Sequence, residues 1–357
     1  MELFKAHQQR ATRPDDERFD SLADLHAATL AYAKTSTERS VPWGDLRTRP
    51  DADQVQLVDK AGTPALLTHY SFGQLANRVG APAEYLRALP PALACDNLNH
   101  GLATRSFSAD GRDAKLLFHV NGGILCRALT TTMYERVWNH EIAERLLEWE
   151  TRGWAPARPT IRAIDGKLPL YASDHDMFVF LAHNDLAIAE PGQDGALYRG
   201  VIVENSEVGA GSLKLTRFLY REMCGNHIIW GASNVMDLSL RHVGSIRSRL
   251  YKWTIALREY QNAGTDKDQQ MVSRAMSTTI ADTKEGVLDK LFGARTLNLS
   301  RRTIEASYDA VVQDQDGSPN TVWGMAQGIT RHLQTLPHAD KRTALDTAAG
   351  KLLEFAF

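Results

Sequence analysis

Apolar residues alternate with polar ones, or form short unbroken runs, through the middle third of the chain. Lys115–Val120 and Ile124–Leu129 flank the turn residues Asn121-Gly122-Gly123, which predicts two strands joined by a tight hairpin. Three similar runs follow: 160–164 continuing to Tyr171, Met177–His183 and Tyr198–Glu204. Strands that follow one another without intervening helices favour an antiparallel sheet.

Other stretches repeat their apolar residues every three or four positions, as amphipathic helices do. We predict helices over Ser21–Lys34, Thr132–Glu150 and Ser212–Cys224, and an almost wholly helical region from 238 to 357. The second of these helices opens on Thr132 with Glu135 three residues later, which is the pattern of a capping box. The last region contains a packing seam formed by Val243, Ile246, Leu250, Trp253 and Leu257.

The first hundred residues are more polar and contain shorter elements. Val55–Val58 and Ala65–Thr68, separated by the turn residues Asp59–Gly62, predict a hairpin. Ser71–Leu89 predicts two short helices broken at Gly80-Ala-Pro82.

Together these elements predict an α+β fold. Its core is an antiparallel sheet of three or more strands with packed helices, in the order β-β-β-α. We expect three parts: a mostly helical N-terminal region with a helical hairpin (1–105), an α+β core (106–235) and a helical C-terminal region (236–357).

The composition is that of an ordinary globular protein, with 43% hydrophobic and 24% charged residues among 357. Lys and Arg number 41 and Asp and Glu 43, and this net charge of −2 does not by itself indicate a nucleic-acid partner. The three cysteines lie far apart, which argues against a disulfide framework and a zinc cluster. No apolar leader opens the sequence and no apolar run is long enough to cross a bilayer, so we expect a cytoplasmic protein without a membrane partner.

One stretch departs from this average charge. Residues 212–258 hold eight basic and two acidic residues, a local charge of +6. Lys214, Arg217 and Arg221 would share one face of the helix predicted over 212–224. The preceding Gly209-Ala-Gly211-Ser212 would let a phosphate approach free N–H groups at the helix N-terminus. This stretch predicts a surface that binds a nucleic-acid backbone, although a solvated basic helix face explains the same pattern.

Two other classes of function stay open. The spacing of Leu75, Gly80 and Leu86 suits a helix-turn-helix over 71–89, which would make the protein a regulator or replication accessory that reads duplex DNA. A purely structural helical hairpin is the favoured explanation of the same spacing. Asp174, His175 and Asp176 resemble part of a metal site, but turn chemistry produces such clusters more often. Phosphate-loop, nucleophile-elbow and zinc-protease motifs are missing from the sequence, so we expect a protein without enzymatic activity, cofactor or metal.

Three stretches carry a resemblance to a known family. They are Leu75–Leu86, Arg199–Ser212 with the downstream Arg221–Ile228, and Asn320–His332. On these stretches the chain resembles the phage/plasmid-like family of uncharacterised proteins carried by prophages and plasmids. It departs from the family pattern at His227, where glycine is expected.

The order of elements is also similar to the core of single-strand-annealing recombination proteins, the phage RecT and Redβ types and the eukaryotic Rad-type protein. That resemblance implies a ring or filament of identical subunits with single-stranded DNA in a basic groove. We therefore expect a non-enzymatic protein that binds and anneals single-stranded DNA. The residues expected at the DNA are Arg199, Gly209, Gly211, Ser212, Lys214, Arg217, Arg221, Arg241, Arg247, Arg249 and Lys252.

Overall fold

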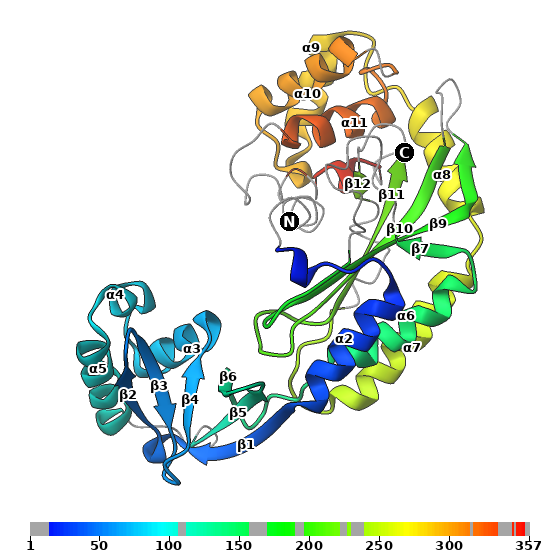
Figure 1. The fold of residues 1–357 in the computed structure, drawn as a ribbon. Helices are drawn as coiled ribbons and strands as arrows, with labels where there is room; N and C mark the ends of the chain where they lie inside the picture. Colours follow the sequence, from blue (N-terminus) through cyan, green and yellow to red (C-terminus); the bar gives the residue numbers. More distant parts are fainter. Residues whose placement is uncertain are drawn as a thin grey trace.

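The computed structural model describes residues 14–105, 112–156, 170–189, 196–221, 227–229, 239–314, 317–334, 345 and 348–353. They form a mixed α+β structure with two six-stranded sheets. Figure 1 shows these sheets in two lobes: the first lobe spans residues 36–131, and the second contains the remaining described residues. The predicted α+β class is confirmed.

The sheet of the first lobe has the strand order β1-β5-β6-β4-β3-β2. Its pairs are antiparallel except β4 with β6, which are parallel. The predicted hairpins at 55–68 and 115–129 are present as β3–β4 and β5–β6. Because β1 pairs with β5, this sheet crosses the predicted boundary at residue 105. The strands are β1 Ser36–Pro42, β2 Arg47–Asp51, β3 Gln54–Val58, β4 Pro64–Leu67, β5 Asp113–Val120 and β6 Ile124–Thr131.

Two helices, α3 (His69–Val79) and α5 (Pro91–Thr104), pack against this first sheet, and α4 (Ala83–Ala88) packs against both of them. The predicted break between the first two is confirmed, because Gly80 ends α3 in the left-handed region at φ 77°. Glycine adopts this conformation without the steric cost of a Cβ atom.

The sheet of the second lobe has the order β12-β11-β10-β9-β7, with β8 also paired to β9, and all its pairs are antiparallel. The strands predicted at 177–183 and 198–204 are confirmed within β9 and β10. The predicted strand at 160–164 lies outside the described residues. The strands are β7 Trp154–Pro156, β8 Leu170–Ala172, β9 Met177–Ala189, β10 Ala196–Asn205, β11 Lys214–Arg221 and β12 His227–Ile229.

One face of this second sheet packs against α2 (Leu22–Lys34), α6 (Asn139–Glu150) and α7 (Ile246–Asn262). Ser21 caps α2 by accepting a hydrogen bond from the Asp24 N–H. Ile246, Leu250 and Trp253 of the predicted seam are buried in this core, whereas Val243 is exposed.

The C-terminal part of the second lobe is helical, as predicted. It contains α8 (Asp266–Ser277), α9 (Lys284–Gly293), α10 (Arg301–Asp314) and α11 (Val322–Gln334), which share one apolar core. Within the described residues, none of the helices has the length and hydropathy needed to span a membrane.

The helix predicted over 212–224 is wrong where the structure describes it, because Lys214–Arg221 is strand β11. This segment pairs with β10 through eight residues, from Glu204↔Lys214 to Leu197↔Arg221. Leu215 and Leu219 then lie on one face of the sheet and Phe218 on the other, all three buried. The last element of the predicted β-β-β-α core is therefore another strand.

The helix predicted from Thr132 begins seven residues later, at Asn139. Its N-terminal box uses Glu141, whose carboxylate accepts a hydrogen bond from the Trp138 N–H. Glu135 instead caps another helix: its carboxylate accepts from the Ile246 N–H at the start of α7, at 2.9 Å. Tyr134 and Trp138, which fall inside the predicted helix, lie in the connection between β6 and α6.

Candidate nucleic-acid interface

The loop after β10 forms the joint between the two lobes. The Glu207 carboxylate lies 2.9 Å from the Arg127 guanidinium of β6, and their side chains are 3% and 1% exposed. Arg127 also donates to the Asp174 carbonyl at 2.8 Å, and the other Glu207 oxygen accepts from the Asn139 N–H at the start of α6. A buried ion pair with these additional hydrogen bonds fixes the loop in place.

Neighbouring residues of this loop also make hydrogen bonds within the protein. Asn205 donates to the Val137 carbonyl, and the Ser206 carbonyl accepts from the Tyr134 hydroxyl at 2.8 Å. The Val208 carbonyl accepts from the Gln74 side chain of α3. A buried carboxylate lies at the centre of this loop where a phosphate was expected.

The predicted phosphate contacts at Gly209, Gly211 and Ser212 therefore lose their basis. No helix follows these residues, so the free N–H groups of a helix N-terminus are not there to bind an anion. Gly209 has φ 89°, and the Ser212 hydroxyl is 2.9 Å from that of Ser239. Gly209 and Gly211 lie in the connection that joins β10 to β11.

Arg199 is an interior residue, and Arg217 beside it is half-buried. The Arg199 side chain lies 3.0 Å from the Asp268 carboxylate of α8 and donates to the Ala263 carbonyl. Both guanidiniums stack on the Tyr260 ring, at 4.0 and 4.6 Å from its centre. Burial raises the pKa of Tyr260 to about 12 and also raises that of Asp268, while the two arginines oppose both shifts. Arg199 is thus too buried to contact a nucleic-acid backbone, and its predicted role is wrong.

The remaining predicted residues of this strand do not restore a basic groove. Lys214 lies opposite Glu204 in the sheet register and is half-buried. Arg221 ends β11, and its side chain lies outside the described residues. The predicted single face of Lys214, Arg217 and Arg221 does not form, because successive strand residues point to opposite sides.

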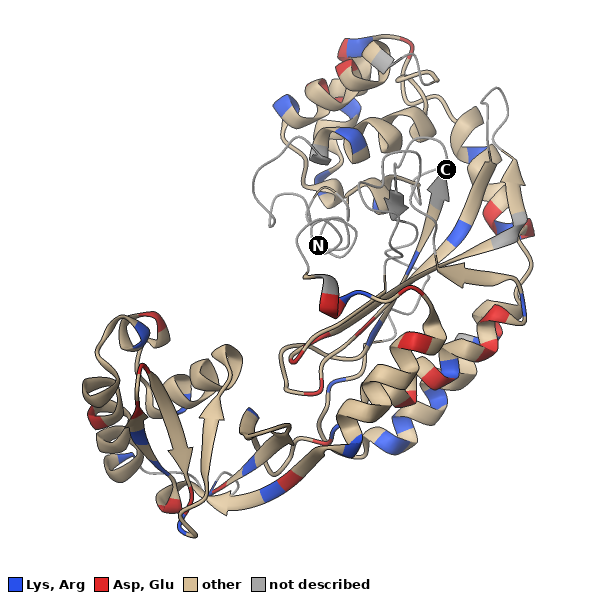
Figure 2. Ribbon diagram, viewed as in Figure 1, with Lys and Arg blue, Asp and Glu red and all other residues tan. Residues whose placement is uncertain are grey.

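The other four predicted basic residues are brought together at the beginning of α7. Arg241, Arg247 and Lys252 are exposed, and Arg249 is half-exposed and donates to the Arg241 and Val243 carbonyls. Figure 2 shows basic positions along this helix on the outside of the second lobe. We call Arg241, Arg247, Arg249, Lys252 and the exposed Tyr251 the α7 surface.

Acidic residues of α6 limit the positive charge beside the α7 surface. Glu141 pairs with Arg247 at 2.7 Å, and Glu148 pairs with Arg258 at 3.5 Å. These pairs are at the protein surface, where each contributes little to stability. A phosphate approaching Arg247 or Arg258 competes with these carboxylates.

Helix α4, which would read duplex DNA in the alternative hypothesis, is short and has one basic side chain. Helix α4, the second helix of the predicted helix-turn-helix, has six residues. Its single basic side chain, Arg87, donates to the His69 carbonyl at 2.7 Å and lies over the Phe72 ring. This arrangement holds α4 against α3.

The Asp174-His175-Asp176 cluster is a hydrogen-bonded turn. His175 lies 3.1 Å from Asp174 and 3.5 Å from Asp176, and the Ser173 hydroxyl donates to Asp176. The hydrogen bond that Asp174 accepts from His175 lowers the pKa of the Asp174 carboxyl group. Among the described residues no group of three or more His, Cys, Asp and Glu side chains is arranged to hold a metal ion.

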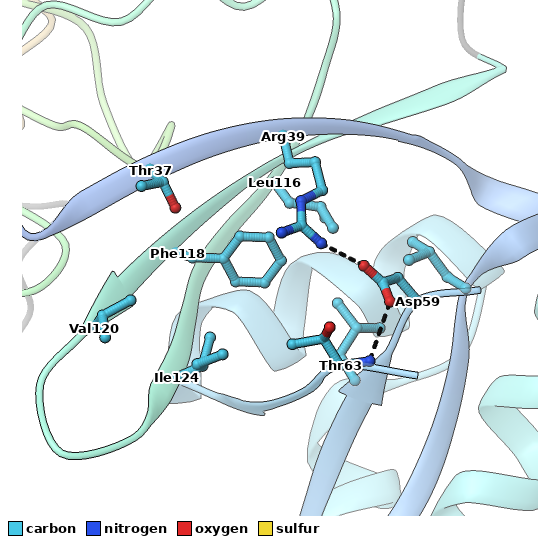
Figure 3. A pocket seen from close by; sticks show the side chains of 10 residues that line it. Thr37, Arg39, Asp59, Thr63, Leu116, Phe118, Val120 and Ile124 are labelled. Carbon is cyan, nitrogen blue, oxygen red and sulfur yellow. Dashed lines mark hydrogen bonds and ion pairs between the residues drawn. The ribbon is translucent and has the colours of Figure 1, made fainter. Parts of the chain in front are cut away.

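Two cavities lie in the described part of the molecule. One of about 310 Å³ lies beside the joint, and the carboxylates of Asp16, Asp174 and Glu207 in its wall disfavour phosphate. The other, of about 100 Å³, lies in the first lobe (Figure 3). There Arg39 is paired with Asp59 at 2.6 Å above the Phe118 ring, so its charge is already neutralised.

Sequence comparison finds a family model that matches part of the second lobe. Residues 172–349 match DUF932, a domain of unknown function. The match includes β9 to β12 and the helices from α7 to α11, and excludes the first lobe. Neither a curated protein nor a solved structure matches the chain.

Proposed function

We propose that this protein is a non-enzymatic single-stranded-DNA-binding protein of a phage or plasmid that promotes annealing of complementary strands. The observation that carries the proposal is the α7 surface, where Arg241, Arg247 and Lys252 are exposed beside the exposed aromatic ring of Tyr251. Basic side chains neutralise phosphates and release counterions, and an aromatic ring offers a stacking platform.

Annealing by this route requires no nucleotide or metal. Side chains that contact only the phosphate backbone leave the base edges available for pairing with a second strand. Because one α7 surface provides few contacts, we propose a homo-oligomer, a ring or filament, that multiplies weak binding along one strand. Light scattering with and without single-stranded DNA tests this assembly, and a monomer of 39.7 kDa in both conditions would contradict it.

The proposed origin in a phage or plasmid rests on the resemblance of three stretches of the sequence to the phage/plasmid-like family. Duplex-reading regulation through residues 71–89 is a weaker second proposal, since the only basic residue of α4 already has structural contacts.

The direct test is fluorescence anisotropy of the full chain with labelled oligonucleotides over a salt series. We expect binding to single strands of unrelated sequence with similar affinity, weakening steeply as salt rises, and faster annealing of complementary strands. Preference for one duplex sequence would support the second proposal, and no binding to either form at low salt would reject both.

A further inference from the structure

Tyr251 is the most exposed large hydrophobic side chain of the described residues, at 69%. Two other aromatic residues of α7, Trp253 and Tyr260, are buried in cores. Tyr251 therefore lies on the side of the helix that packing leaves free, and the fold does not explain its aromatic ring. An aromatic ring exposed beside basic side chains offers a flat face on which a nucleic-acid base can stack.

The neighbours of Tyr251 define what such a ligand must contain. Arg247 lies one helical turn before it and Ile255 one turn after it, and both are exposed. Lys252 follows directly and is also exposed. The helix rises about 6 Å over four residues, so a planar ring is placed one turn from a guanidinium and next to an ammonium group.

Unpaired nucleotides match this arrangement because each joins a flat aromatic base to a negatively charged phosphate. A base in a duplex is stacked on both faces and cannot offer one to Tyr251 without being unstacked. We infer that Tyr251 stacks on an unpaired base while Lys252 binds an adjacent phosphate and Arg247 exchanges its pair with Glu141 for another, which makes Tyr251 the residue that selects single strands over duplex. This inference rests on the proposed function.

The test compares Tyr251→Ala and Tyr251→Phe with the wild type, using anisotropy on single-stranded and duplex DNA. Phenylalanine keeps the ring and should keep the affinity. Alanine should weaken single-strand binding about 5- to 150-fold, the range found when one base loses its stacking partner. Duplex binding and the slope of log affinity against log salt should not change, because no ion pair is lost.

Phe292→Ala is the matched control, because Phe292 is 55% exposed but lies on α9, outside both the α7 surface and residues 71–89. It should leave both affinities unchanged. Equal weakening of single-strand and duplex binding by Tyr251→Ala would overturn the inference, as would an affinity like that of the wild type. A Tyr251→Ala protein that loses its oligomeric state would also overturn it, since the ring would then be a contact between copies. If the wild type binds no DNA, the proposed function itself fails.

Discussion

The Arg127 guanidinium and the Glu207 carboxylate, 80 positions apart in sequence and 2.9 Å apart in space, link the sheets of the two lobes. The Tyr32 ring lies 4.4 Å from the guanidinium carbon, so this charge has both an ionic and an aromatic partner. The pair is at the junction of β6, α2, α6 and the loop after β10. Its integrity should therefore decide whether the lobes keep their arrangement.

Replacing Glu207 with Gln should destabilise the protein by about 3–5 kcal/mol, because Arg127 is left buried without its counter-charge. Urea unfolding measures the loss. The control is Glu148→Gln, which breaks the exposed pair with Arg258 and should cost less than about 1 kcal/mol. Similar midpoints for the two variants would show that the buried pair does not hold the joint.

Replacing Arg199 with Ala should also destabilise the fold, because it leaves Asp268 buried without its partner and uncovers Tyr260. We expect a loss of roughly 3–5 kcal/mol, as for other broken buried pairs. Lys252→Ala, on the exposed face of α7, should change the free energy of unfolding by less than about 0.5 kcal/mol. If the Arg199→Ala protein were as stable as the wild type, the buried pair with Asp268 would not stabilise the fold, and Arg199 could again be considered as a surface contact.

His242 should make stability depend on pH. Burial, together with the charges of Arg136 and Arg249, lowers its pKa to about 4, and its Nδ1 lies 3.2 Å from the Glu135 carbonyl. Between pH 4 and about 6.5 the unfolded state then binds a proton that the folded state does not. Stability should thus fall as pH drops below about 6.5, by at most roughly 3 kcal/mol at pH 4 from this residue.

Urea unfolding from pH 7.5 to 4.5 measures this effect, with His242→Asn as the comparison. Asparagine keeps a donor for the Glu135 carbonyl but does not titrate, so the variant should lose part of the dependence. Burial also lowers the pKa of His119 and His332, which should leave a smaller slope of the same sign. Identical pH profiles for wild type and variant would contradict a buried neutral His242.

The α+β class and most strands and helices were predictable, because their apolar periodicity is strong and local. Segment 214–221 shows where this fails: its basic residues are spaced three and four apart, while Leu213 and Leu215 alternate as in a strand. Eight residues of pairing with β10 decide between the two, and that pairing is not visible in the local sequence.

The sequence anticipated which basic residues lie together only for the second half of the predicted set, and their binding of a nucleic acid stays a prediction. Arg241, Arg247, Arg249 and Lys252 are gathered near the start of α7, as their spacing in a helical region suggests. Arg199 was missed as an interior residue because its partner Asp268 is on a distant helix. A lone acid followed by small residues, as at Glu207, likewise gives no sign that an arginine 80 positions earlier binds it.

Glu148→Gln should strengthen binding to single-stranded DNA, because it releases Arg258, which lies on α7 two helical turns after Tyr251 of the α7 surface. The slope of log affinity against log salt should steepen by about 0.7 if Arg258 gains one phosphate contact. Glu150→Gln is the control, since it removes the same charge from an exposed residue of α6. Equal gains from both variants would indicate a general charge effect, not release of Arg258.

The measurement that tests the α7 surface most directly is the salt dependence of single-strand binding by Arg247→Ala/Lys252→Ala. Both residues are exposed, so the variant should fold normally. Two lost phosphate contacts should make the slope shallower by about 1.4, and the weakening should be similar for all sequences. Lys60→Ala/Arg302→Ala removes the same charge from exposed positions elsewhere and should keep the wild-type slope. A folded Arg247→Ala/Lys252→Ala protein with the wild-type slope would contradict the account.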